Sequence, residues 1–307
     1  MLPQIAQNFL TEMVNKNRKP STIKRYNADL RVFLNWLSDY RANSNLEELE
    51  TYKSLTNDDI TAYLTYLTHK KYSPDTTRRL ASVLRGLLTY LNINTHVIPK
   101  RANVAVKRDL NRFDFITDEE WLLLLRNVQN ISITSTRYIL KDRNISILIL
   151  LRFYGLSASE IHRMEMRDIN FAQQTLTVRS EAITRTLSIK KQDIELMIKY
   201  FNCIPKMIRP RYWSSDPFFV SYYNQTKSFH YDYQKSEPKR LSVRGIQKMI
   251  KDETEKAGMR NVSSTNLRNT CILDMLKTDA AENNIVLFFG LSNNLSLSRY
   301  MKYIKMI

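Results

Sequence analysis

Apolar residues recur at three- and four-residue intervals along the first third of the chain, and this is the spacing of a helix that buries one face. Only 5 glycines and 8 prolines interrupt the 307 residues, fewer glycines than ordinary usage would give. Hydrophobic residues make up 43% of the chain, which is enough for a packed core and excludes a disordered or collagen-like protein. The pattern therefore predicts a mostly helical fold.

Residues 1–95 predict a unit of four helices. Pro20 separates the first helix from the second, and Ser21 or Thr22 can cap the second. A polar, acidic connection follows, after which Thr56 and Ser73 begin the third and fourth helices. The apolar positions that set this periodicity are Ile5, Phe9, Met13, Ile23, Leu30, Phe33, Leu37, Ile60, Tyr63, Leu67, Leu80, Leu84, Leu87 and Leu91.

Residues 96–112 lose the periodicity and collect basic side chains, so we interpret them as an interdomain linker. The second domain, 113–307, opens with a predicted helix at Thr117 and is expected to be mainly helical, with the stripe 122–125 in its core. Between Asn170 and Ile189, two β-branched runs flank a short polar stretch, which predicts a small β-hairpin. The expected class is mostly α (α+β).

The formal charge is strongly positive and is spread over both domains. The chain has 47 Lys and Arg against 30 Asp and Glu, a net charge of +17 with a pI near 9.8. Since the excess is not confined to a detachable tail, both domains are expected to face one polyanion, most simply nucleic acid. The alternatives are a solvated basic surface and contact with an anionic membrane; charge does not separate DNA from RNA.

Other classes of protein fit the sequence poorly. No apolar run approaches the ~20 residues that span a bilayer, and the first residues lack the pattern of a secretory signal, so we expect a cytoplasmic protein. Cys203 and Cys271 lack metal-ligand spacing and are expected to be free thiols. His162 and His230 have no partner at ligand spacing, so no metal and no cofactor are expected.

A group of tyrosines lies in a polar stretch of the second domain. Its members are Tyr222, Tyr223, Tyr231 and Tyr233. We interpret the stretch as a partly buried loop; the alternative is a surface that stacks on bases.

Four short motifs follow one another in the second domain. They are Gly155-Leu156-Ser157-Ala158-Ser159-Glu160-Ile161 with Arg167-Asp168-Ile169-Asn170-Phe171, the predicted hairpin, Thr265-Asn266-Leu267-Arg268-Asn269-Thr270, and Phe289-Gly290-Leu291-Ser292 with Tyr300. In order and spacing they resemble the tyrosine recombinase (phage integrase, Xer-like) family. The resemblance implies a SAM-like, helical core-binding domain over 1–95 and a catalytic-type domain over 113–307, closing as a clamp on duplex DNA.

The resemblance also implies a chemistry and a set of residues. A tyrosine hydroxyl attacks a DNA phosphodiester, so cationic donors must converge on one phosphate. Tyr300 matches the nucleophile and Arg268 matches one of the family's two arginines. The places of the other four groups hold residues that cannot do the same work: Ser157 for the first arginine, Thr265 and Leu291 for two histidine-like donors, and Ser180 or Glu181 for the hairpin lysine. The site is therefore expected to be degenerate.

Neighbouring cations could replace part of the missing charge. The candidates are Arg152, Arg179, Arg185 and Arg299. An arginine can supply charge but is a poor proton donor, because its pKa lies above ~12. Glu160 and Asp168 are interpreted as residues that hold the local turn. Candidate DNA contacts outside the site are Arg78, Arg79, Arg85, Lys100, Arg101, Lys107 and Arg108.

Three hypotheses follow. In the first, the chain is an enzyme of site-specific recombination or integration, within a mobile element, that cleaves DNA through Tyr300. In the second, it is an inactive homologue that binds DNA as a regulatory, architectural or accessory protein. In both, the expected partners are double-stranded DNA, further copies of the chain as a dimer or tetramer, or an active recombinase, at the nucleoid. The third hypothesis is a helical repressor or RNA-binding protein with chance motif matches.

Overall fold

The computed structural model describes residues 2–42, 45–93, 109–135, 137–179, 183–278, 280–291 and 294–306. The chain divides into two compact units, residues 1–106 and 107–307. Six predicted site or DNA-contact residues lie outside the described residues: Lys100, Arg101, Lys107, Arg108, Ser180 and Glu181. Most of the predicted basic linker lies outside them as well.

Unit 1 is helical, as predicted. Its helices are α1 (Gln4–Asn15), α2 (Pro20–Tyr40), α3 (Leu49–Lys53), α4 (Asn57–His69) and α5 (Pro74–Tyr90). The four long helices confirm the sequence prediction, but α3 lies in the segment that we predicted to be a polar connection. It was missed because a single short turn that buries only Tyr52 is too short to show a period.

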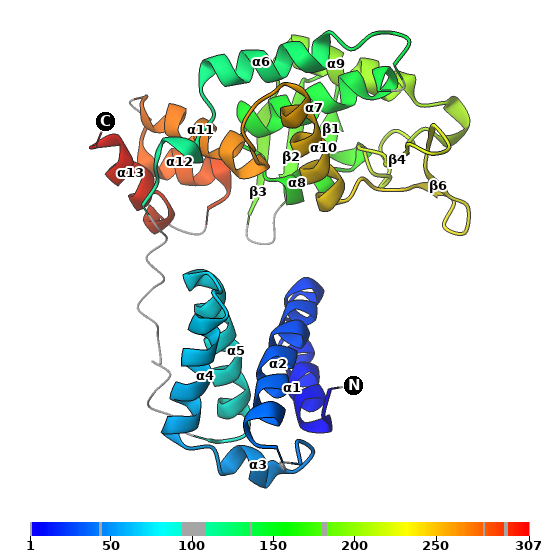
Figure 1. The fold of residues 1–307 in the computed structure, drawn as a ribbon. Coiled ribbons are helices and arrows are strands. Elements are labelled where there is room, and N and C mark those ends of the chain that lie inside the picture. The colour runs from blue at the N-terminus through cyan, green and yellow to red at the C-terminus, as the bar shows by residue number, and fades with distance from the viewer. Residues whose placement is uncertain are drawn as a thin grey trace. The chain divides into compact units, whose positions relative to one another are not determined.

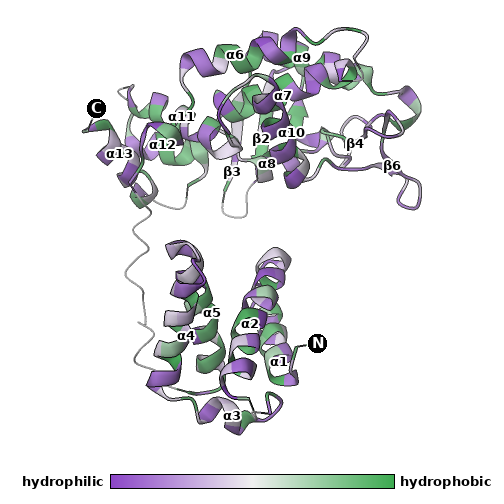
Figure 2. Ribbon diagram, viewed as in Figure 1, coloured by the Kyte–Doolittle hydropathy of each residue, from purple (hydrophilic) through white to green (hydrophobic). Residues whose placement is uncertain are grey.

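Local sequence explains where the helices of unit 1 begin and how they are joined. Pro20 occupies the first turn of α2, and Thr56 forms a capping box with Asp59 at the start of α4. The buried apolar residues of these helices form one core. In Figure 2 the hydrophobic residues of unit 1 appear in green along its helices. Arg79 of α5 donates to both carboxylate oxygens of Asp29 in α2, at 2.8 and 3.1 Å, and so ties these two helices together.

The described residues of unit 2 form more helices and three small antiparallel sheets, whose arrangement Figure 1 shows. Its helices are α6 (Asp118–Gln129), α7 (Lys141–Arg152), α8 (Ala158–Arg163), α9 (Lys191–Cys203), α10 (Val243–Lys256), α11 (Ser264–Leu276), α12 (Glu282–Phe289) and α13 (Ser298–Ile304). The strands are β1 (Ile169–Asn170), β2 (Thr175–Arg179), β3 (Thr184–Ser188), β4 (Tyr222–Tyr223), β5 (Ser228–Phe229), β6 (Tyr231–Asp232) and β7 (Glu237–Pro238). The mostly α class is confirmed.

The sheets match the sequence prediction in part. β2 and β3 form the predicted hairpin, with Val178 opposite Arg185, and β1 adds a third strand to it. The tyrosine-rich stretch is not the loop that we predicted, because β4 pairs with β5 and β6 pairs with β7. Two-residue strands leave almost no alternating pattern to read in a sequence. Tyr222 and Tyr231 are half-buried, whereas Tyr223 and Tyr233 are exposed.

Helix α7 lies at the centre of unit 2. It is buried on nearly all sides and contacts α6, α9, α10 and α11. The predicted leucine stripe of α6 is only partly core, because Leu124 is fully buried but Leu122 and Leu123 are 48% and 47% exposed. Helices α11, α12 and α13 gather at one end of the unit and the β4–β7 hairpins lie at the other (Figure 1). No helix in the described parts of the chain is long and apolar enough to cross a membrane.

Gly155, in the turn between α7 and α8, lets α12 pack against that turn. Its φ is +62°, and a Cβ there would lie 2.0 Å from Cε1 of Phe289. Phe289 is completely buried and belongs to a second apolar cluster, which also contains Tyr300. A side chain at Gly155 would therefore push α12 away from the turn.

We expect Gly155→Ala to lower the free energy of unfolding of unit 2 by about 2–4 kcal/mol, through left-handed strain and overpacking together. Urea unfolding of the full chain measures this. Gly258→Ala is the matched control: its φ is +67° but nothing lies within 4 Å of the added carbon, so only the strain should be seen. Equal losses in the two variants would contradict the role of Gly155 in seating Phe289.

Candidate active site

Ser157, in the place of the family's first arginine, caps helix α8. Its hydroxyl accepts from the backbone N–H of Glu160, and its own N–H donates to the Glu160 carboxylate at 2.7 Å. The hydroxyl also donates to that carboxylate at 2.8 Å. These bonds fix Glu160 at the start of α8, so Ser157 orients an anion where the family places a cation.

The Glu160 carboxylate binds two arginines from distant elements. Nη1 of Arg185, on β3, donates to Oε1 at 2.6 Å, and Nη1 of Arg268, on α11, donates to Oε2 at 2.7 Å. The side chains of Glu160, Arg185 and Arg268 are 3%, 7% and 16% exposed. We call these three residues the Glu160 cluster. Because it is buried and bonded on both oxygens, removing one member would leave an uncompensated charge.

The charge state of Glu160 follows from its partners. Burial alone would raise the pKa of this carboxyl, but the hydrogen bond from Arg185, the charge of Arg268 and the N–H of Ser157 together hold the pKa below its usual value. Glu160 is therefore ionised at neutral pH, and the cluster carries two positive charges and one negative charge.

Arg268 is held from a second side as well. Its Nη2 donates to the backbone carbonyl of Phe289 at 2.7 Å, and its guanidinium lies 5.7 Å from the centre of the Phe289 ring. Since Phe289 is seated against Gly155, the end of α12 helps to set the orientation of Arg268. Arg268 is thus fixed by a carboxylate, a carbonyl and a ring.

Tyr300, the candidate nucleophile, is 6% exposed and lies in the apolar cluster around α11, α12 and α13. Its hydroxyl donates to Oδ1 of Asn269 at 2.7 Å, and Asn269 in turn donates to the carbonyl of Asp114 at 3.1 Å. Burial raises the pKa of Tyr300, while the charges of Arg299 and Arg268 oppose that rise. The phenol is therefore protonated at neutral pH, and its proton points to an amide oxygen.

The four candidate substitute cations go to different places. Arg185 joins the Glu160 cluster, and Arg299 lies 5.2 Å from the centre of the Tyr300 ring. Arg152 instead pairs with Asp274 at 2.6 Å, and Arg179 pairs with Asp168 at 2.9 Å. The structure therefore places two of the four candidate cations at the site: Arg185 shares Glu160 with Arg268, and Arg299 lies next to the Tyr300 ring.

The remaining predicted residues lie apart from these contacts. Thr265 is exposed near the start of α11, and Leu291 packs against the apolar cluster that contains Phe289 and Tyr300. In unit 1, Arg78 pairs with Asp75 at 3.0 Å, Arg79 with Asp29, and Arg85 is half-buried on α5.

Sequence reasoning missed Asn269 and Phe289 as parts of the site. Asn269 directly follows Arg268, and Phe289 directly precedes Gly290, so both lie inside the motifs that drew attention to their neighbours. Their adjacency was the available signal. What the sequence does not contain is the fold that brings the Asn269 amide to Tyr300 and the Phe289 carbonyl to Arg268.

Metal ligation has little support in the described residues. No group of three or more His, Cys, Asp or Glu side chains that could hold an ion occurs among them. Nδ1 of His162 lies 2.7 Å from the carbonyl oxygen of Leu241, and Cys203 and Cys271 are free thiols. The polar chemistry of the site therefore comes from arginine, carboxylate, amide and phenol groups.

We expect Glu160→Gln to lower the free energy of unfolding at neutral pH by about 3–5 kcal/mol, because it leaves two arginines buried without their anion. The folded carboxyl has a lowered pKa, so its contribution is complete above the unfolded value of ~4.3 and is lost as the pH falls through the folded pKa. Urea unfolding from pH 7 downward should show this acid-dependent loss in the unmodified chain and a flatter profile in the variant. Glu255→Gln, at an exposed carboxylate, is the control. An equal loss of stability in the two variants would contradict the stabilising role of the Glu160 cluster.

Comparison with known proteins shows which proteins this chain is similar to. Residues 6–93 match the family model described as "Phage integrase, N-terminal SAM-like domain". The tyrosine recombinase XerC of Caldanaerobacter subterraneus subsp. tengcongensis is 24% identical over 289 residues, covering 87% of this chain and 74% of the relative. XerC of Listeria monocytogenes is 26% identical over 268 residues, covering 81% of this chain and 78% of the relative.

Solved structures share the fold. XerH site-specific recombinase bound to its difH substrate superposes with a TM-score of 0.64 at 16% identity, covering 95% of this chain and 79% of that one. The Tn1549 transposon integrase in complex with transposon right end DNA gives a TM-score of 0.63 at 15% identity, covering 96% and 94%. These likenesses agree with the resemblance of the motifs. The chain is thus similar in sequence to XerC tyrosine recombinases, and it shares its fold with solved site-specific recombinases and integrases.

Proposed function

We propose that this chain binds duplex DNA and acts in site-specific recombination, with Tyr300 as the nucleophile and Arg268 as a ligand of the attacked phosphate. Structural relatives were solved with DNA, among them the XerH and Tn1549 proteins, and the chain carries a net charge of +17. A partner with regularly spaced negative charge fits that excess. We extend the proposal to two DNA-facing domains, over 1–95 and 113–307, that work at the nucleoid.

The observation that carries this proposal is the fixed position of Arg268 near a tyrosine hydroxyl. Glu160 and the Phe289 carbonyl each accept one hydrogen bond from its guanidinium. The positive charge of Arg268 is close enough to oppose the rise that burial causes in the pKa of Tyr300. A guanidinium held in advance needs little reorganisation when negative charge develops on a phosphate.

The proposed step is a transesterification. The Tyr300 oxygen attacks phosphorus, a 3′-phosphotyrosyl bond forms, and the bond from phosphorus to the 5′-oxygen breaks. The phenol proton passes to water, because Asn269, whose amide accepts its hydrogen bond, is not a base. Arginines do not release protons at neutral pH, so the departing 5′-oxygen takes its proton from water. We therefore propose a slow reaction that uses no metal or nucleotide.

A second candidate function is a binding protein that has lost cleavage. The burial of Tyr300 and its bond to Asn269 favour this candidate, because the hydroxyl must leave that bond before it can reach a phosphate. In this case the fold is kept for holding DNA, beside further copies of the chain or an active recombinase. Covalent trapping separates the two candidates.

For trapping, the full chain is incubated with duplexes nicked close to a binding site selected from random DNA. The nick lets the short 5′-OH fragment diffuse away, so a covalent intermediate accumulates and can be seen on a denaturing gel. We expect a slowly forming adduct in the unmodified chain and none in Tyr300→Phe, which keeps the ring and its packing. Tight binding by both proteins with no adduct in either would reject cleavage and leave the binding candidate.

Arg268 is tested separately from the fold that it supports. Arg268→Lys keeps a positive charge for Glu160 but cannot bond the carboxylate, the carbonyl and a phosphate together. We expect adduct formation to fall by about 10²–10³-fold, the usual effect of losing one preorganised donor, with DNA affinity weakened alike on all sequences. A loss confined to one base position, or an unchanged adduct yield, would refute the phosphate contact.

A further inference from the structure

Three arginines of this chain bind an internal carboxylate through the same edge of the guanidinium, the edge formed by Nε and Nη2. Such a pair of donors matches the two oxygens of a carboxylate or a phosphate. The three pairs are Arg79 with Asp29, at 2.8 and 3.1 Å, Arg211 with Asp216, at 2.9 and 2.8 Å, and Arg260 with Glu120, at 2.6 and 2.9 Å. We call this pair of donors the Nε–Nη2 edge.

Arg185, on β3, has no acceptor at its Nε–Nη2 edge. Its Nη1 donates to Glu160 at 2.6 Å, but Nε and Nη2 are both buried and neither has a hydrogen-bond partner. The side chain is only 7% exposed. Among the arginines that the structure describes, Arg185 alone has two buried donors without a partner. A buried donor that has lost water without gaining an acceptor costs free energy, so an acceptor at this edge would stabilise the chain.

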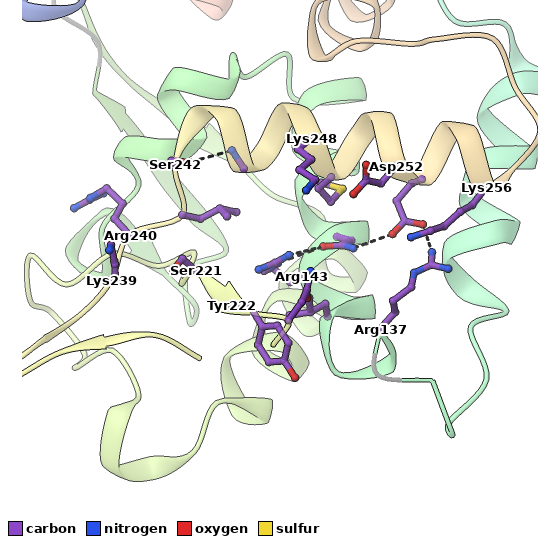
Figure 3. A pocket seen from close by; sticks show the side chains of 17 residues that line it. Arg137, Arg143, Ser221, Tyr222, Lys239, Arg240, Ser242, Lys248, Asp252 and Lys256 are labelled. Carbon is purple, nitrogen blue, oxygen red and sulfur yellow. Dashed lines mark hydrogen bonds and ion pairs between the residues drawn. The ribbon is translucent and has the colours of Figure 1, made fainter. Parts of the chain in front are cut away.

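Arg143, another buried arginine, shows that burial alone does not leave this edge unpaired. Arg143 is 5% exposed and makes no ion pair with the described residues. Its Nε and Nη2 nevertheless donate to the side-chain oxygen of Asn144, at 3.2 and 3.1 Å (Figure 3). Its Nη1 donates to the carbonyl of Val220 at 3.3 Å. The fold thus supplies a neutral acceptor where no carboxylate is present, and it does not do so for Arg185.

Arg185 and Arg268 lie close enough together for one small anion to contact both. Glu160 demonstrates this, since Oε1 accepts from Arg185 at 2.6 Å and Oε2 accepts from Arg268 at 2.7 Å. Arginine binds carboxylates and phosphates in the same way, because two oxygens of either anion fit its planar donors. The Glu160 cluster carries two positive charges and one negative charge. It can therefore accept one further anion of charge −1.

We propose that the Nε–Nη2 edge of Arg185 binds a phosphodiester of DNA, the same phosphate that Arg268 contacts. A phosphodiester offers two non-bridging oxygens to the two donors, and its single negative charge balances the excess of the Glu160 cluster. The turn before α8, where the resemblance implies an arginine, holds Ser157, so this ligand comes from a different element. The inference rests on the proposed function in taking DNA as the partner and Arg268 as a phosphate ligand.

The test combines a change of the arginine with a change of the phosphate. In the full-length chain, Arg185→Lys keeps a positive charge for Glu160 but loses the Nε–Nη2 edge. Arg211→Lys is the matched control, because Asp216 already occupies that edge of Arg211. The DNA is a binding site selected from random sequence, made as a set of duplexes that each carry one methylphosphonate. This group has a methyl in place of a charged oxygen, so that phosphate loses its charge and one acceptor.

We expect Arg185→Lys to weaken binding to the all-phosphate duplex by about tenfold, the usual effect of losing a hydrogen bond to a charged group. At one position, the methylphosphonate should weaken binding by the unmodified chain about tenfold and binding by Arg185→Lys much less, because that contact is already lost. Arg268→Lys should lose its sensitivity at the same position. Arg211→Lys should respond to every duplex as the unmodified chain does. Fluorescence anisotropy at one fixed salt concentration measures the affinities.

The pattern over the set of duplexes separates a phosphate contact from an effect on the fold. If Arg185→Lys weakens binding to every duplex by the same factor, Arg185 acts only through the fold and the inference is overturned. Sensitivity lost at different positions in Arg185→Lys and Arg268→Lys would overturn the shared phosphate. If urea unfolding shows that Arg185→Lys does not fold, a crystal structure of the unmodified chain on the selected duplex decides. Nε and Nη2 bonded to one phosphate support the inference, and any other partner overturns it.

Further readouts keep this inference separate from the proposed function. A phosphate-specific loss in Arg185→Lys, with no adduct from any protein, retains the inference and rejects only cleavage. Equal adduct formation by Arg185→Lys and the unmodified chain, with no phosphate-specific loss, rejects the inference and leaves the proposed function standing. A rise in Tm with inorganic phosphate that Arg185→Lys abolishes, beside an unchanged methylphosphonate pattern, would assign the edge to free phosphate and overturn the DNA contact. Absence of DNA binding by the unmodified chain would reject both proposals.

Discussion

The ionised carboxylate of Glu160 is the contact on which the candidate site of unit 2 depends. Ser157 fixes it at the start of α8, Arg185 reaches it from β3 and Arg268 reaches it from α11. Arg268 then bonds the end of α12 through the Phe289 carbonyl, so one buried anion links four elements. Because both oxygens are bonded, the position of one element constrains the others, and a local change at Ser157 or Gly155 reaches the guanidinium of Arg268.

The same network explains why the two halves of the site behave differently. Arg268 is fixed by charges and a ring that are already in place, whereas the hydroxyl of Tyr300 donates a neutral hydrogen bond to Asn269 and lies beside the charge of Arg299. A neutral bond exchanges more readily than a buried ion pair, because breaking it leaves no charge behind. In the proposed reaction, Arg268 would therefore keep its place, and the Tyr300 hydroxyl would exchange its bond to Asn269 for the phosphate.

The sequence predicted what local rules determine and missed what only the tertiary fold determines. The long helices were found, and Thr56 and Ser73 cap α4 and α5 as predicted. The predicted cap of α2 at Ser21 or Thr22 was wrong, because α2 already begins at Pro20 and Lys19 is its N-cap residue. The single turn of α3 and the two-residue strands β4–β7 carry too little pattern to be predicted. Motif order located Arg268 and Tyr300. Choosing Arg185 among the candidate cations needed the fold, because Glu160 lies 25 residues from Arg185 and 108 from Arg268. Arg152 and Arg179 were equally plausible until Asp274 and Asp168 proved to be their partners.

These pairings also change the meaning of the net charge of +17. Arginines such as Arg79, Arg185 and Arg268 already form ion pairs with carboxylates, which neutralise part of their charge. These pairs hold helices and the site together. A cation with an internal anion releases few counterions when a polyanion binds. The salt dependence of DNA binding therefore depends on the number of basic side chains without an internal ion pair, and not on the formal net charge. On this physical ground, a lysine without an internal anion would contribute more to the salt dependence of DNA binding than an arginine held in an ion pair.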